Sequence, residues 1–438
     1  MKTIKICLLA LISTITACTN DSIQQSVNEK NEYGATPHYV SYEQALSDAI
    51  DFMSQDSAVT RSVDSYKVAT HYEYSANSKT RTANSDTIDV RFHVINFADN
   101  SGFALVAADD RTTPVYAYSY DGNLDIDDAI ENTGFAEFIE NAIVNYKIDV
   151  ENSEKEPKSR LDPDPDYNYW VTHLPTGYYN GVLYYKDSYF TTIASKAAML
   201  TTAWAQCDPY NYYCPTYLSG NPDYNGRTAT GCAPIAMAQI MAYHENPTHY
   251  VSQYGIEPFP WSTIKSQSTY SVGDYSNNIL LVATLISQIQ AYASVYYDIK
   301  TGWAASYIDA VKYAFECLNY STSNIYTGYY GVPGDSLQLS LNNNRPVFAS
   351  GYSLVGNNGH AWVIDGYRYE QQVTKYYNMT YPYALAHTSY NLCYKPYYHC
   401  NWGWGGDYNA FVLNFSYDGN VSNRYTVNNA FLHNIHPN

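Results

Sequence analysis

One cysteine of this chain lies where a helical pattern begins, a position that suits a nucleophile. Cys232 follows Gly231, which permits a sharp turn, and precedes Pro234, which a helix tolerates only in its first turn. The apolar spacing that follows predicts a helix over residues 232–244. The macrodipole at a helix N-terminus favours the thiolate, which is the form of cysteine that attacks carbonyl groups. A buried structural cysteine is nevertheless the more frequent occupant of such a position, so Cys232 alone does not indicate an enzyme.

A histidine further along the chain could serve as the general base for this cysteine. His360 follows Gly359 at the start of a strongly β-forming run and lies 128 residues after Cys232. A strand would hold the imidazole rigidly, and Gly359 would leave room for a substrate backbone. If the two side chains are adjacent in space, the imidazole takes the thiol proton and later gives it to the leaving amine. A lone histidine is more often structural, so this pair also needs support from other residues.

Two further segments carry groups that such a mechanism uses. Asn401 ends a predicted strand, and its amide could orient the imidazole while Trp402 and Trp404 shield that bond and wall the cleft. A Trp-Gly turn that packs at a core edge explains this segment equally well. Upstream, Gln206 could donate a side-chain hydrogen bond to the oxyanion, beside the backbone N–H of Cys232.

These four segments together resemble the streptopain family of papain-like cysteine peptidases, over most of residues 200–435. The motifs are Gln-x-x-Pro-Tyr-Asn at 206–211, Thr-Gly-Cys followed by Ala-Gln-Ile-Met within 230–241, Gly-His-Ala-x-Val-Ile-Asp-Gly at 359–366, and Asn-Trp-Gly-Trp-Gly-Gly at 401–406. The resemblance implies a papain-like fold and endopeptidase activity on proteins or peptides, with no metal and no other cofactor.

The resemblance also assigns a role to each candidate residue. The nucleophile is Cys232, the base is His360, the oxyanion donor is Gln206, and Asn401 with Trp402 forms the segment that supports the histidine.

A substrate-binding loop is implied as well. Gly302 and Trp303 occupy the place of a Gly/Ser-rich loop that lines the family's cleft, where the large Trp303 is a departure that could narrow a subsite or only pack. With Gly359 and Trp404 they make up the predicted substrate-binding set.

The N-terminal part resembles the inhibitory prosegment of the same family. The resemblance rests on Phe-Ala-Leu-Val-Ala-Ala-Asp-Asp-Arg at 103–111 and on residues 114–122, and it implies a zymogen whose prodomain covers the cleft until it is cut away. The alternative is a permanent accessory domain.

The first residues predict export and attachment to a membrane. Lys2 and Lys5 precede a short apolar run at residues 6–15, and Ala17-Cys18 ends it in the manner of a bacterial lipobox. We therefore expect a signal peptide over residues 1–17 and lipidation of Cys18, so that the protein is anchored at the cell envelope or surface or is released after processing. The alternative is an ordinary secretory signal with an incidental cysteine.

The predicted elements give an α+β fold in two parts. A tether over residues 18–35 leads to an inhibitory prodomain over 36–150, then a charged, proline-rich linker and uncertain maturation region over 151–190, and a peptidase domain over 191–438. Helices are expected at 40–53 (capped by Ser41), 135–146, 232–244, 278–294 and 304–318. Strands are expected at 87–98, 102–107, 115–118, 347–350, 361–367, 397–401 and 410–415.

Composition limits the remaining possibilities. The chain has 438 residues, 45% of them hydrophobic, which suits a globular protein, and its net charge of -18 argues against nucleic acid as a partner. Local pairing of Cys207 with Cys214 and of Cys393 with Cys400 is as plausible as buried free thiols. A non-catalytic surface binding protein on this fold, or a Cys-His amidase or transglutaminase, remain alternatives to the peptidase.

Overall fold

The computed structural model divides into two compact units, residues 1–39 and residues 40–438. The described residues are 38–55, 66–76, 88–131, 133–155, 176–217, 224–327, 334–352, 359–380, 384–392, 396–413 and 429–438. The predicted signal peptide, the tether, Cys18, Cys393 and residues 156–175 of the predicted linker lie outside them. Within the described residues, no helix is both long enough and apolar enough to cross a membrane.

The first part of the larger unit, which we call the N-terminal lobe (residues 40–155), is a small antiparallel sheet with helices. Its elements are α1 (Tyr42–Ser54), β1 (Val68–Ser75), β2 (Arg91–Phe97), β3 (Phe103–Ala107), β4 (Val115–Ser119), the one-turn α2 (Ile126–Ala129) and α3 (Thr133–Lys155). The side chain of Ser41 accepts a hydrogen bond from the backbone N–H of Gln44, as its predicted capping role requires. α1 contacts β2, β3 and β4, so its apolar face covers this sheet.

The remainder, the C-terminal lobe (residues 176–438), contains a helical layer. Its helices are α5 (Cys232–His244), α6 (Trp261–Ile264), α7 (Asn277–Tyr292), α8 (Ile308–Cys317) and α9 (Gly334–Asn342). α5 is apolar on almost every side and packs against α7 and the strand β14, which explains why nearly all its side chains are buried. The helix predicted from residue 304 begins four residues later, because Ala304 and Ala305 pair instead with Tyr297 and Tyr296 in a short hairpin.

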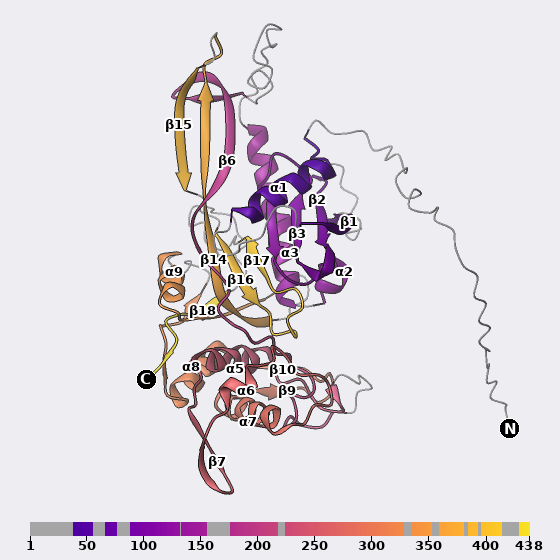
Figure 1. The fold of residues 1–438 in the computed structure, drawn as a ribbon, viewed down its shortest axis with the longest axis vertical. Helices are drawn as coiled ribbons and strands as arrows, with labels where there is room; N and C mark the ends of the chain where they lie inside the picture. Colours follow the sequence, from indigo (N-terminus) through magenta and orange to yellow (C-terminus); the bar gives the residue numbers. More distant parts are fainter. Residues whose placement is uncertain are drawn as a thin grey trace, which may run out of the picture. The chain divides into compact units, whose positions relative to one another are not determined.

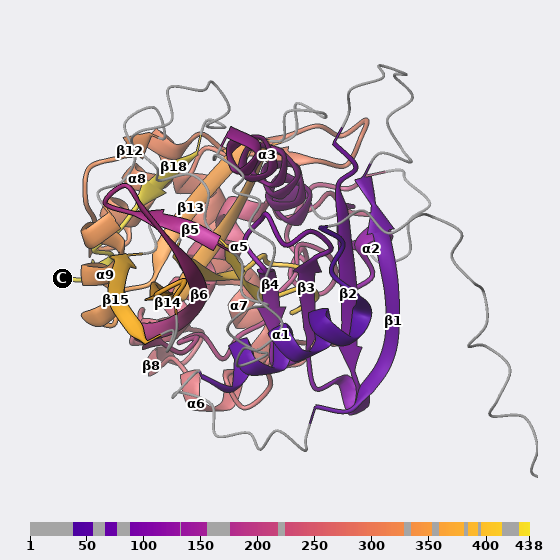
Figure 2. The ribbon, with the colours of Figure 1, turned by 90° about the horizontal axis from the view of Figure 1, so that it is seen from above.

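The second layer of the C-terminal lobe is an antiparallel sheet that continues into the N-terminal lobe. Its strands are β12 (Tyr326–Thr327), β13 (Val347–Tyr352), β14 (Gly359–Tyr377), β16 (Tyr397–Asn401), β17 (Ala410–Leu413) and β18 (Ala430–Leu432). The order is β1-β2-β3-β4-β17-β16-β14-β13-β18-β12, and Figure 2 shows the row running through both lobes. Val412 of β17 pairs with Ala117 of β4, so one sheet joins the two lobes.

A β-structured arm was not predicted from the sequence. The far half of β14 pairs with β6 (Val182–Lys196) and β15 (Leu385–Leu392), and β6 also pairs with β5 (Thr176–Tyr179). These strands project away from α5, α6, α7 and α8 (Figure 1). The linker predicted for 151–190 therefore differs from the structure at both ends. Residues 151–155 continue α3, and residues 176–190 lie in or between β5 and β6, whose Tyr and Thr residues favour strands.

Candidate active site

Cys232 lies at the first position of α5, as the sequence predicted. Gly231 before it has a φ of 90°, a conformation that residues with a side chain rarely adopt, so the turn into the helix depends on this glycine. The backbone N–H groups of Cys232, Ala233 and Ala361 point at the thiol and favour its anion. Burial of the thiol has a larger and opposite effect, so the pKa of Cys232 lies above its usual value. The site is thus built for a thiolate but holds a thiol in this closed state.

His360 is the second residue of β14, opposite Gly351 of β13 in the register. Its Nε2 lies 2.8 Å from the backbone oxygen of Trp402. A carbonyl oxygen can only accept, so Nε2 carries the proton and Nδ1 carries the lone pair that a general base needs. Burial lowers the pKa of His360 to about 4, against the opposing effect of this hydrogen bond, so the imidazole is neutral at pH 7.

Both residues border one cleft of about 420 Å³ between the helical layer and the sheet. Trp303 and Gly359 also line it, and Val311 and Phe348 contribute apolar side chains. Trp303 is 57% exposed, so its ring forms part of the cleft wall and not of the core.

Two members of the predicted substrate-binding set lie elsewhere. Gly302 lines a separate pocket with Tyr217, and its carbonyl accepts a hydrogen bond from the backbone N–H of Ala229. Trp404 lies in a turn, where its carbonyl accepts a hydrogen bond from the backbone N–H of Asp407. It is not among the described residues that line the cleft. Gly302 is excluded although it adjoins Trp303, and neither Trp404 nor the nearby Trp402 is among the described residues that line the cleft.

The structure places Asn401 differently from the prediction. Its Nδ2 donates to the carbonyl of Thr202 at 2.8 Å, and its Oδ1 accepts from Nε2 of Gln239 at 3.1 Å and from the N–H of Gly403 at 3.2 Å. Asn401 therefore ties the sheet to α5, and the group that orients His360 is the backbone carbonyl of the next residue.

Gln206 lies beside the turn that leads into the nucleophile. Its backbone carbonyl accepts a hydrogen bond from the N–H of Thr230 at 3.0 Å, which brings the segment predicted to supply the oxyanion donor next to Cys232 in space. The neighbouring Trp204 is fully buried, and its backbone N–H donates a hydrogen bond to Oε1 of Gln239. α5 and the Gln206 segment are thus fixed to each other through Gln239, which the sequence analysis quoted within a motif without giving it a role.

Within the described residues, no disulfide joins any two of the cysteines Cys207, Cys214, Cys232, Cys317 and Cys400. The suggested Cys207–Cys214 disulfide is therefore absent in this structure. Cys214 instead accepts a hydrogen bond from Nε2 of Gln290 at 3.2 Å.

Comparison with known proteins decides the family. Residues 204–412 match the Peptidase C10 family, and residues 37–143 match the Spi protease inhibitor. The region over residues 204–412 belongs to the peptidase C10 family. The matched ranges cover the cleft residues and the N-terminal lobe, so the predictions of a cysteine-type peptidase and of an inhibitor-like prosegment are confirmed at the level of family.

Relatives of this peptidase C10 chain are bacterial. The thiol protease/hemagglutinin PrtT of Porphyromonas gingivalis is 26% identical over 357 residues, which are 75% of this chain and 34% of that protein. Streptopain of Streptococcus pyogenes serotype M1 is 23% identical over 340 residues, 71% of this chain and 70% of the relative. Among solved structures, a prointerpain A fragment of Prevotella intermedia has a TM-score of 0.47 at 20% identity and covers 80% of this chain and 96% of its own.

The inhibitor-like lobe reaches the site through α3, a contact that the sequence did not reveal. A Cβ added to Gly134 would lie 2.6 Å from Cδ2 of His360 and 2.7 Å from Cε3 of Trp402. The α3 backbone therefore presses directly on the histidine and on the residue that orients it. Phe135 adds an edge contact to the Trp402 ring, with centroids 6.3 Å apart. No sequence motif marks Gly134, because its importance comes only from its contact with His360 and Trp402, which are distant in sequence.

Proposed function

We propose that the protein is an exported cysteine endopeptidase, made as a zymogen, with Cys232 as the nucleophile and His360 as the general base. The observation that carries the proposal is that both residues line one cleft, in a chain of the peptidase C10 family. The apolar walls of that cleft suit the side chains of a protein or peptide substrate.

The proposed reaction follows from the orientation of the histidine. Nδ1 of His360 takes the thiol proton, and the thiolate of Cys232 attacks the scissile carbonyl carbon. The backbone N–H of Cys232 and the side chain of Gln206 stabilise the oxyanion. The imidazolium then protonates the leaving amine, and water releases the acyl group by the same sequence in reverse order. The carbonyl of Trp402 keeps Nε2–H fixed throughout.

The latent state of the enzyme is a neutral pair. Burial raises the pKa of Cys232 and lowers that of His360, and both shifts oppose the thiolate–imidazolium state. Removal of a prodomain over residues 36–150, by cutting between residues 151 and 190, would rehydrate the cleft and reverse both shifts. We further propose that residues 1–17 direct export and that lipidated Cys18 anchors the precursor in the envelope.

The decisive experiment is intact mass spectrometry and peptide hydrolysis on the wild-type chain and on Cys232→Ala. We expect the wild type to lose its N-terminal lobe and to hydrolyse casein, and the Cys232→Ala chain to do neither on its own. Cys317→Ala is the matched control, because Cys317 is an exposed free thiol away from the cleft. Casein turnover by Cys232→Ala at the wild-type rate would refute the assignment.

A further inference from the structure

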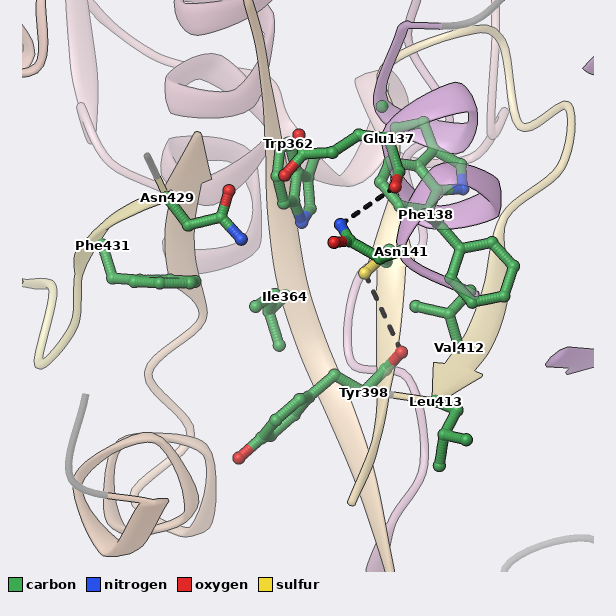
Figure 3. Close-up of a pocket in the computed structure, with 13 residues that line it drawn as sticks. Glu137, Phe138, Asn141, Trp362, Ile364, Tyr398, Val412, Leu413, Asn429 and Phe431 are labelled. Carbon is green, nitrogen blue, oxygen red and sulfur yellow. Dashed lines mark hydrogen bonds between the residues drawn. The ribbon is translucent and has the colours of Figure 1, made fainter. Parts of the chain in front are cut away.

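α3 carries a carboxyl group into the interface between the two lobes. Glu137 is 3% exposed and lines a small cavity of about 60 Å³ that separates α3 from the sheet of the C-terminal lobe. Figure 3 shows its side chain among Trp362, Asn429 and other residues of both lobes. A carboxyl group in such a place must be either neutralised or paired.

The contacts of this carboxyl group are few. The side chain of Asn429 hydrogen-bonds to Glu137, while Oε2 of Glu137 has no hydrogen-bond partner among the described residues. Gly351 lies so close that a Cβ there would be 2.3 Å from one carboxyl oxygen and 2.5 Å from the other. Because Gly351 pairs with His360, the carboxyl group packs against the strand position opposite the proposed base.

Among the described residues, no cation faces Glu137. The titratable groups that share its surroundings are Glu140 on α3 itself, Tyr398 and Cys400 on β16, and His360 on β14. The first adds a like charge, and burial keeps the Cys400 thiol and the His360 imidazole neutral at pH 7. Burial, with a smaller contribution from Glu140, raises the pKa of Glu137 to about 8.

We propose that Glu137 makes closure of the N-terminal lobe proton-dependent: the lobe docks with Glu137 protonated, and ionisation of this carboxyl group loosens α3 and uncovers His360. The inference rests on the proposed function only in calling the uncovered site active. What the inference describes is the equilibrium between the docked and undocked N-terminal lobe, and this equilibrium exists whether or not the cleft hydrolyses peptides.

The direction of the effect follows from proton linkage. In the undocked lobe Glu137 meets water and has an ordinary pKa of about 4.3. The docked state holds the proton up to about pH 8, so docking is strongest below the undocked pKa and weakens as pH rises. The expected loss is at most about tenfold for each pH unit between about 5 and 8, and the profile is flat above that range.

Amide hydrogen exchange of α3 in the full-length Cys232→Ala chain tests this without any need for activity. Dividing its protection factors by those of the Cys232→Ala, Glu137→Gln chain removes every pH effect that does not come from Glu137. The ratio should fall severalfold to tenfold per pH unit from pH 6 to pH 8, because the amide cannot ionise. Parallel profiles in the two chains would overturn the proposal.

Circular dichroism shows whether the Cys232→Ala, Glu137→Gln chain folds. If it does not fold, a second variant tests the proposal. Glu140→Gln removes the like charge, lowers the docked pKa of Glu137, and should therefore reduce the total loss of protection between pH 5 and 8. An unchanged profile in that variant would equally overturn the proposal. Since all chains carry Cys232→Ala, neither result depends on whether Cys232 is the nucleophile.

Discussion

At the scale of single residues, the site combines a nucleophile position and a base position that are individually unremarkable. A cysteine at a helix start and a histidine at a strand start occur in many proteins for structural reasons. They can act as a nucleophile and its base because both line one cleft and because the lone pair of His360 is on Nδ1. The carbonyl of Trp402 fixes that tautomer through the main chain, so the orienting group survives any substitution of its own side chain that preserves the fold.

This reasoning predicts a structural and not a catalytic defect for Asn401→Ala. The change leaves the buried donors of Gln239 and Gly403 without their acceptor, at a cost of about 1–3 kcal/mol in the free energy of unfolding. Urea denaturation of the activated enzyme measures it. The acid limb of the pH–rate profile should stay in place, because Trp402 still holds His360.

The matched control for this prediction is Asn343→Ala, which removes an exposed amide from the end of α9. It should change the free energy of unfolding by no more than about 0.5 kcal/mol. A displaced acid limb in Asn401→Ala with unchanged stability would instead restore Asn401 as the group that orients the histidine.

At the scale of elements, α3 is the part that closes the site. It is the longest helix of the N-terminal lobe, and residues near its first turn contact the active-site histidine while its remainder packs in the lobe. A glycine in a helix is unfavourable by about 1 kcal/mol relative to alanine. Its presence at position 134 is explained by the 2.6 Å approach that a Cβ would make to His360.

We therefore predict that Gly134→Leu opens the uncut chain. Leucine favours the helix itself but overpacks the contact with His360 and Trp402, which costs about 1–3 kcal/mol of docking free energy. The open fraction should rise by about 5- to 150-fold. Deuterium labelling of the α3 amides, read by peptide mass spectrometry, measures this rise. Glu151→Leu, at an exposed position of the same helix, serves as the control and should label like the wild type.

At the scale of the whole larger unit, several contacts join the lobes, and three of them bear on what happens after cleavage between the lobes. One is the α3 contact, and a second is the pairing of β4 with β17 that makes a single sheet. The third is Arg368 of β14, which is fully buried, forms an ion pair with Glu370, and stacks on the ring of Phe52 from α1 with 3.8 Å between guanidinium carbon and ring centroid. Cutting the chain between the lobes breaks none of these contacts.

A nicked chain should consequently hold together until these contacts are lost. Size-exclusion chromatography after cleavage between residues 155 and 176 should show both lobes in one peak at pH 6. Phe52→Leu keeps the apolar volume but removes the ring face, so it should weaken attachment by about 0.5–2 kcal/mol. Phe97→Leu is the control, because this buried ring packs within the N-terminal lobe on Tyr66. Immediate separation of the wild-type lobes would contradict this account.

Much of the architecture could be read from local patterns. The helix at 232–244 was predicted with its observed limits, and the strands at 103–107 and 397–401 were predicted within a residue, because helical and alternating periodicities are strong there. The β-arm was missed, because its strands lie partly in a segment that reads as linker and their pairing is set by contacts between residues about 180 positions apart, such as Gln372 and Phe190.

The sequence by itself determined the chemistry available to this protein: a cysteine at a helix start, a histidine at a strand start, and their flanking motifs are local signals. Only the tertiary structure decided which atoms do the positioning. It replaced the amide of Asn401 by the carbonyl of Trp402, moved Gly302 and Trp404 out of the cleft, and set Gly134 and Glu137 against the site. The physical reason is that carbonyl direction, close backbone approach and burial of a charge depend on neighbours distant in sequence, which no local pattern records.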